Sequence, residues 1–520
     1  MDTYNGNKHE LQSQLKRNNT AIFFNGSFLT NTSTLEDNSF LRAKATVEHS
    51  FNKRWLGAFT NLETNNRKNI GTNNFINTSH RFKEFETYFG VGDTAKVFAK
   101  FGFNHRSNDS IQSNKFTEIN NRKSFYINSK LIKNTNTNLN LYGNFRLTEN
   151  NFSENEQSLN SRLIFNQKLF HNFLNLSTLY ETSSGNVARQ EYIYIKTEPG
   201  LGFYTWIDYN SDGIQDFDEF EIAEFQDQAN YLRVPKPNLR FLATQRAKFK
   251  QTINLNFNQW KTKNGVKKIL SHFNNESFLN VENEQSRIDN SFNFNPFNFN
   301  EEKLISLNFS LQNRLYFNKN IQKYSTTYTF GKLRNKQQYF IGTQANSTKT
   351  HQIDFAHKFA SFWLFDLMVK ISDNELQTEN FNNRNYIIIG KEIQPKISFL
   401  YSENNKLTAF YHYKNKENSL QSFEKLAQRK FGLEYLYLQG KKNQITANVN
   451  VFLNDFKGNT NTPVAYQMLE GLQAGENYTW NLLFNRKLNS FLNLNLNYLG
   501  RKSKNSKTIH TGNVQLRAVF

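Results

Sequence analysis

The run from Asp208 to Glu219 holds the side chains best suited to chemistry in this chain. Its spacing matches the calcium loop D-x-[DN]-x-[DN]-G-x₅-E, in which oxygens from one short segment surround a hard cation and Gly213 permits the turn. The ligands expected of such a loop are Asp208, Asn210, Asp212, the Ile214 carbonyl, Asp216 (directly or through water) and bidentate Glu219. The motif therefore predicts a site for Ca²⁺ or a similar divalent ion.

The alternative is an acidic surface loop whose Asn and Asp residues only make turns. The flanks do not resemble the paired helices of a calcium sensor. The motif instead interrupts a β region, after 203–206 and before 230–234. We therefore expect a structural ion that orders a long loop, rather than a switch.

No other motif assigns a catalytic residue. The sequence 90–95 matches G-x-G-x-x-[GA], but it lies between alternating strands and predicts a hairpin turn. Walker, H-E-x-x-H and G-x-S-x-G motifs are absent, and the 10 His residues are scattered without ligand spacing. We expect a protein that is not an enzyme. A hydrolase with a Ser and His pair at a barrel rim is the alternative, for which no residue is assigned.

Most of the predicted elements are β-strands in which apolar and polar residues alternate with a period of two. In 491–499, Leu492, Leu494, Leu496 and Tyr498 share one face of a strand and the intervening Asn residues share the other. The same pattern recurs at 139–147 and 445–453. Roughly 20–26 such strands predict an all-β fold, a large antiparallel up-and-down transmembrane β-barrel.

Composition agrees with this fold class. The chain has 51 Phe and 23 Tyr in 520 residues, although its mean hydropathy is only -0.73. A barrel reconciles the two values, because only alternate residues meet lipid and aromatic side chains gather at its interfaces. The sequence contains no run of about 18 apolar residues, which is the length that a membrane-spanning helix needs. The absence of cysteine is compatible with an oxidising periplasm.

The net charge is +20, with basic residues spread through turns and alternate strand positions. This distribution disfavours nucleic acid as a partner, since no basic cluster on a helix or sheet platform is visible. It favours lipopolysaccharide phosphates or an anionic cargo. The run 290–300, with repeated Phe-Asn pairs, is expected to be a loop that binds a partner or folds back into the lumen.

The last strand is predicted at 512–520, with Gly512, Val514, Leu516, Ala518 and Phe520 on one face. A final strand of this pattern resembles the last strand of bacterial outer-membrane barrels. That resemblance implies recognition of the Phe520 strand by the barrel-insertion machinery and a location in the bacterial outer membrane.

Connection lengths alternate in the carboxy-terminal half, as they do in transmembrane barrels. Short connections are expected at 360–361, 403–405, 439–443 and 488–490, and longer ones at 374–384, 414–429, 455–475 and 500–507. If Phe520 ends in the periplasm, the longer connections face outside. Upstream of His351 the alternation is ambiguous, because 318–322 and 333–336 both read as short turns.

The expected organisation has three parts. Residues 1–197 form amino-terminal barrel strands, 198–236 form a long loop with the acidic motif, and 237–520 form carboxy-terminal barrel strands. The amino terminus shows no charged and apolar signal peptide. We therefore expect that an upstream segment and a signal peptide precede this chain.

The segments 203–234, 466–475 and 509–520, with the Asn- and Lys-rich composition, resemble a family of large outer-membrane β-barrel proteins of Bacteroidota, of flavobacterial type. The resemblance covers roughly residues 190–520 and carries no known activity. The function expected is a pore or conduit, or a component of a transport or secretion assembly. The alternative is a surface-binding or structural barrel whose calcium-ordered and aromatic loops engage glycan or protein, with other envelope proteins as possible partners.

Overall fold

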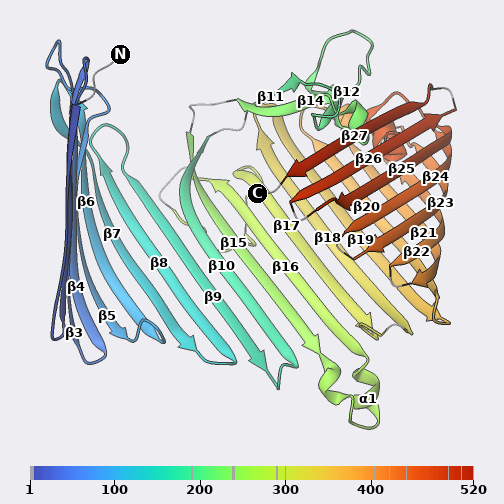
Figure 1. Cartoon of the computed structure of the whole chain (residues 1–520), viewed down its shortest axis with the longest axis horizontal. Coiled ribbons are helices and arrows are strands. Elements are labelled where there is room, and N and C mark those ends of the chain that lie inside the picture. Colours follow the sequence, from blue (N-terminus) through green and yellow to red (C-terminus); the bar gives the residue numbers. More distant parts are fainter. Residues whose placement is uncertain are drawn as a thin grey trace.

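The computed structural model describes residues 5–518, apart from 189–190, 237–240, 288–290, 299, 322, 403, 421, 441, 490 and 505. It consists of one 23-stranded antiparallel sheet and one 4-stranded sheet. Figure 1 shows the large sheet as a single layer of tilted strands that curls at its carboxy-terminal end. The all-β, up-and-down fold and the strand number predicted from the sequence are confirmed.

Strands of the large sheet follow one another in chain order, and each pairs with its neighbours in the chain. The amino-terminal strands are β1 (Asn5–Arg17), β2 (Thr20–Thr32), β3 (Glu36–Phe51), β4 (Arg54–Asn69), β5 (His80–Gly92), β6 (Phe98–Gln112), β7 (Lys115–Lys133), β8 (Thr137–Asn150), β9 (Glu156–Leu169) and β10 (Leu174–Ala188). The next are β15 (Phe241–Asn256), β16 (Phe273–Ser286), β17 (Leu304–Phe317), β18 (Tyr324–Tyr339), β19 (Gly342–Phe359) and β20 (Trp363–Thr378). The last are β21 (Tyr386–Ser402), β22 (Asn405–Asn418), β23 (Lys425–Gln439), β24 (Asn443–Lys457), β25 (Gly475–Lys487), β26 (Leu492–Ser503) and β27 (Ile509–Ala518). Within the described ladder, β1 and β27 are the two edge strands.

The register of the last two strands follows their alternation. Leu494 lies opposite Leu516, and Asn495 lies opposite Gln515. Because opposing residues of a ladder point to the same side, Leu492, Leu494 and Leu496 share a face with Val514 and Leu516. The predicted faces of both strands are confirmed up to Ala518, and Phe520 lies outside the described residues.

The large sheet has an apolar face and a polar face, and these names are used below. The apolar face exposes large side chains such as Phe101 and Phe125, which are 50% and 51% exposed. Exposed rings on long, hydrogen-bonded strands suit contact with hydrocarbon, where every backbone polar group must be paired within the protein. The chain is accordingly a protein of the bacterial outer membrane. Among the described residues, no helix is long and apolar enough to cross a membrane.

Connections at the two ends of the sheet differ in length. At one end, the loop end, they span 379–385, 419–424, 458–474 and 504–508. At the other, the turn end, they span 360–362, 403–404, 440–442 and 488–491. The alternation predicted for this half is confirmed.

In the upstream half, one loop-end connection is shorter and one turn-end connection is longer than the alternation predicts. The turn predicted at 333–336 is wrong, because these residues lie inside β18 and the connection to β19 spans 340–341. The connection 257–272 lies at the turn end and is long, with η3 (Phe257–Trp260) and α1 (Val266–Leu270), as Figure 1 shows.

The Phe-Asn run packs on the apolar face, rather than in the lumen. Asn283 donates to the Pro296 carbonyl at 2.6 Å, and Tyr180 donates to the Phe294 carbonyl at 2.6 Å. Phe297 packs against Phe249 of β15, with ring centroids 5.5 Å apart. Residues 291–298 thus cover a hydrogen-bonding patch that would otherwise interrupt the apolar face.

The acidic motif belongs to a small sheet that we call the cap, residues 191–236. Its strands are β11 (Glu191–Lys196), β12 (Tyr204–Trp206), β13 (Phe220–Ile222) and β14 (Tyr231–Lys236), with the short helices η1 (Phe217–Glu219) and η2 (Gln226–Gln228). The long loop expected at 198–236 is therefore a folded sheet, and its first strand lies upstream of 198. The cap lies at the loop end, between β10 and β15 in the chain (Figure 1).

Candidate functional site: the cap and the polar face

An aromatic cluster holds the cap together. The Tyr194 ring stacks on Phe220 with centroids 3.9 Å apart, and Phe220 packs edge-on against Tyr231 at 5.1 Å. Gly202 lies so close to β14 that a Cβ there would be 2.6 Å from the Tyr231 backbone nitrogen. The cap is thus a packed unit whose backbone tolerates no side chain at this crossing.

Arg384 is the main contact between the cap and the large sheet. It lies in η4 (Asn382–Arg384), in the connection between β20 and β21. Its guanidinium donates to the carbonyls of Asp218 and Phe220 at 3.2 and 3.1 Å and to the Glu221 carboxylate at 2.9 Å. One side chain therefore binds both η1 and β13 of the cap.

Glu221 is buried, with 6% of its surface exposed. Burial raises the pKa of Glu221 to about 7, although the nearby Arg384 favours the charged form. This carboxyl group therefore titrates close to neutral pH. Its charge state depends on whether the cap is docked.

Two further contacts anchor the cap. Tyr466 of α2 (Pro463–Leu469) donates to the Ile222 carbonyl and accepts from the Glu224 amide, both at 3.2 Å. Arg501, on the polar face of β26, forms an ion pair with Asp227 at 2.6 Å and lies over the Phe225 ring. The cap is thereby attached to the polar face of the sheet as well as to its loops.

Helix α2 is itself folded onto the polar face. Val464, Met468 and Leu469 are buried against Ile388 of β21 and Leu426 of β23, which form a hydrophobic cluster. Thr462 caps the helix by accepting from the Ala465 amide at 3.1 Å. Because α2 is fixed by this cluster, it provides a firm support for the cap.

Glu470 ends α2 in a left-handed conformation and binds two lysines of β22. Lys414 and Lys416 lie 2.8 and 2.9 Å from its carboxylate. Burial alone would raise the pKa of Glu470, but Lys416 and Lys414 outweigh it and hold the pKa at about 2. The pair of lysines is thus matched by a carboxylate that stays charged.

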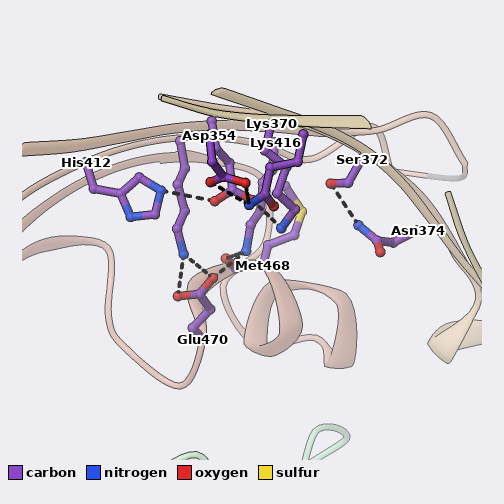
Figure 2. A network of polar contacts seen from close by, with 11 residues as sticks. Asp354, Lys370, Ser372, Asn374, His412, Lys416, Met468 and Glu470 are labelled. Atoms are coloured by element: carbon purple, nitrogen blue, oxygen red, sulfur yellow. Dashed lines mark hydrogen bonds and ion pairs between the residues drawn. The ribbon is translucent and has the colours of Figure 1, made fainter. Parts of the chain in front are cut away.

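Figure 2 shows that this pair continues along the polar face as a network of polar contacts. His412 lies 3.0 Å from Glu392 and Lys370 lies 3.1 Å from the same carboxylate. Lys416 also donates to the Met468 carbonyl at 3.0 Å. The network thus lines the polar face near α2 with paired polar and charged side chains.

The acidic motif forms a tight turn in the cap, and its residues 210–217 are exposed. The Gly213 amide donates to Asp208 at 3.0 Å, and Asn210 and Asp212 are hydrogen-bonded to each other at 2.9 Å. Ser211 and Gly213 have φ of 62° and 74°. One carboxylate oxygen of Asp208 is buried and has no hydrogen-bond partner among the described residues, so it is available as a ligand for a cation.

Glu219 is buried and its oxygens already accept hydrogen bonds. Trp206 donates to it at 2.8 Å and the Tyr209 amide at 3.2 Å. Within the described part of the chain, no group of three or more acidic or His side chains is placed to hold a metal. Asp208, Asn210 and Asp212 thus lie together, while the predicted ligands as a set, with Ile214, Asp216 and Glu219, stay a prediction.

The residues that fix the cap carry no local signal in the sequence. Arg384 and Arg501 lie far along the chain from Glu221 and Asp227, so no local spacing signals either pair. The segment 466–475 stands out in the sequence only through its family resemblance. Within this segment, Tyr466 contacts the cap and Glu470 binds two lysines of β22.

Comparisons with known proteins name no family. No family model and no curated protein matches the chain. Among solved structures, it is similar to the FrpB iron transporter of Neisseria meningitidis, at 9% identity and TM-score 0.37, covering 99% of this chain and 79% of that one. It is also similar to the ferric-catecholate import receptor Fiu of E. coli K12, at 8% identity and TM-score 0.30, covering 96% and 76%. OmpT, an outer membrane protein of Vibrio cholerae, shows 13% identity and TM-score 0.24, covering 69% and 89%. Likenesses this distant carry no functional argument.

Proposed function

We propose that the chain is an outer-membrane pore or conduit, alone or within a transport or secretion assembly, and that the cap restricts passage along its polar face. The observation that carries this proposal is the docking of the cap. Arg501 reaches the cap from the polar face itself, so the cap lies over the wall that a solute would follow. Closure of the sheet by its two edge strands is part of the proposal, since closure satisfies both edges.

Conductance in planar bilayers tests this function. We expect a small or intermittent current from the native chain, and a larger one after Arg384→Ala and Arg501→Ala are combined, because the cap then loses its charged anchors. Arg314→Ala is the matched control, because Arg314 is an exposed residue of β17 that takes no part in these contacts. A silent double variant that is folded and inserted would contradict the proposal.

The alternative is a surface-binding protein in which Ca²⁺ orders the cap for glycan or protein. The partner-free oxygen of Asp208 supports an ion there. Ca²⁺ is then expected to protect the cap from protease, and Asp208→Ala with Asp212→Ala should abolish that protection. Asp93→Ala, in a distant hairpin turn, is the control. Protection that is equal with and without Ca²⁺ would remove the ion from the proposal.

Lipopolysaccharide is the lipid partner that we propose. Lys332 of β18 and Lys349 of β19 lie opposite each other, are exposed and share the apolar face with Leu311. Opposing like charges destabilise a bare strand pair, so phosphates would relieve them. We also propose that the Phe520 strand is recognised by the barrel-insertion machinery and that further envelope proteins are partners. The same proposal includes membership of the Bacteroidota family and excludes nucleic acid as a partner.

An enzymatic activity is not part of the proposal. Release of fatty acid from phospholipid vesicles by the purified protein would favour the rim hydrolase instead.

A further inference from the structure

Three arginines gather on the polar face of the amino-terminal half, away from the cap. They are Arg106 on β6, Arg122 on β7 and Arg146 on β8. Arg106 lies directly opposite Arg122, while Arg146 lies opposite Ser124, one step along the same face. Like charges in directly opposed positions destabilise a sheet, so this arrangement needs a compensating group.

The protein itself compensates only part of this charge. Arg106 lies 3.8 Å from Glu84, donates to Asn108 at 2.9 Å and lies over the Phe82 ring. Arg146 donates to Ser158 at 3.2 Å. Arg122 has neither a hydrogen bond nor an ion pair within the described residues, although it is partly buried.

Nearby carboxylates are already engaged. Glu84 accepts from Asn104 at 2.8 Å and from Asn61 at 3.3 Å. Glu86 accepts from the Tyr126 hydroxyl and from Lys100. Within the described residues, neither carboxylate forms an ion pair with Arg122; Glu86 lies near Lys100 and Glu84 near Arg106.

Some other basic residues of the same face are paired. Arg162 binds Glu181 at 2.8 Å, and Lys248 lies 3.3 Å from Glu282. What distinguishes the three arginines is that two of them lie directly opposite each other beside a hollow.

A hollow of about 450 Å³ lies at this place. Lys100 lines it together with the three arginines, and Glu84, Glu86 and neutral groups such as Asn104, Ser124 and Asn144 complete the lining, so basic side chains outnumber carboxylates there. Guanidinium groups bind phosphate and carboxylate through two parallel hydrogen bonds, which a lysine cannot reproduce. The hollow has the size, charge and donors for a small anion.

We propose that Arg106, Arg122 and Arg146 form a binding site for a phosphate-bearing solute, with Arg122 as its central ligand. The proposal rests on the proposed function in one respect, that the polar face is wet and open to solutes. The anion would lie between the three guanidinium groups and relieve their repulsion. A solute following the wall would then be retained by its phosphate group.

Binding of inorganic pyrophosphate to the purified chain in detergent, measured by isothermal titration calorimetry at low salt, tests the site. We expect Arg122→Gln to weaken binding about tenfold or more, the size of a lost charge-assisted hydrogen bond. Arg122→Lys should fall between, because it keeps the charge and loses the paired geometry. Arg162→Gln is the matched control and should change binding less than about twofold, because Glu181 already pairs with Arg162.

No measurable binding to the native chain would overturn the inference. So would an equal loss in Arg122→Gln and Arg162→Gln, which would indicate a diffuse charge effect. Conductance separates the two proposals. Binding without any current would leave the site standing and contradict the pore, whereas a current without binding would contradict the site alone.

Discussion

At the scale of single residues, the polar face is governed by whether each buried charge has a partner. Glu470 forms ion pairs with both Lys414 and Lys416. Arg122, by contrast, lies opposite Arg106 and forms no ion pair within the described residues. Removing one partner from a buried pair leaves the other charge uncompensated, which costs more than the pair itself contributes. Substitutions at Glu470 and at Arg122 should therefore act in different ways, the first on stability and the second on binding.

Glu470→Gln is expected to destabilise the chain by about 1–3 kcal/mol, because Lys414 and Lys416 lose a charged acceptor. The pKa of Glu470 is lowered when folded, so its contribution is present above about pH 4.5 and is lost as the pH falls toward 2. Native and variant chains should therefore converge in acid. Heat-dependent mobility on SDS gels at several pH values measures this, with Glu417→Gln as the control, since Glu417 and Lys425 form an exposed pair.

At the scale of elements, alternation is a local signal, and the strands could be predicted for that reason. For example, the alternation from Leu492 to Tyr498 shows within a single segment which residues share a face of the strand. The turn at 333–336 was wrongly predicted because a distant contact decides its structure. Arg334 and Lys336 look like turn residues, but they lie on a strand and bind Glu301. The cap sheet was not predictable, because its pairing and its docking by Arg384 join segments far apart in the chain.

The cap should be sensitive to pH through Glu221. Its pKa is raised to about 7 in the docked state, so docking is strongest below about pH 4.5 and weakens as the pH rises through 7. Limited proteolysis of the cap should accordingly be slower at pH 5 than at pH 8. Glu221→Gln should remove most of this difference, because the amide does not titrate. The same slope in native and variant chains would assign the effect to another group.

Several strand glycines lie beneath aromatic rings of the neighbouring strand. A Cβ on Gly57 would be 2.2 Å from the Tyr88 ring, and one on Gly500 would be 2.0 Å from the Trp480 ring. Gly57→Ala should therefore displace Tyr88 and destabilise the sheet by about 1–3 kcal/mol. Gly331→Ala is the matched control, since its Cβ would meet only Thr350 at 4.0 Å. Thermal unfolding followed by circular dichroism compares them, and equal midpoints would show that the ring moves at no cost.

At the scale of the whole molecule, the sheet has a defined direction, because the cap, α2 and η4 all lie at the loop end. The sequence supported this direction only downstream of His351. Upstream, the short connection 340–341 at the loop end and the long connection 257–272 at the turn end break the rule of length. Length alone is therefore a weak guide to sidedness, and the strand count from a known end is the firmer one.

Sidedness can be measured directly, because the chain has no cysteine and any introduced thiol is unique. Asn459→Cys lies in the loop-end connection 458–474, and Asn264→Cys lies in the turn-end connection 257–272. With the last strand ending in the periplasm, we expect a membrane-impermeant maleimide to label Asn459→Cys on intact cells. Asn264→Cys should be labelled only after the outer membrane is permeabilised, although its connection is also long. The cysteine-free chain is the control, and labelling of both thiols on intact cells would contradict an orientation in which the cap faces outward over the polar wall.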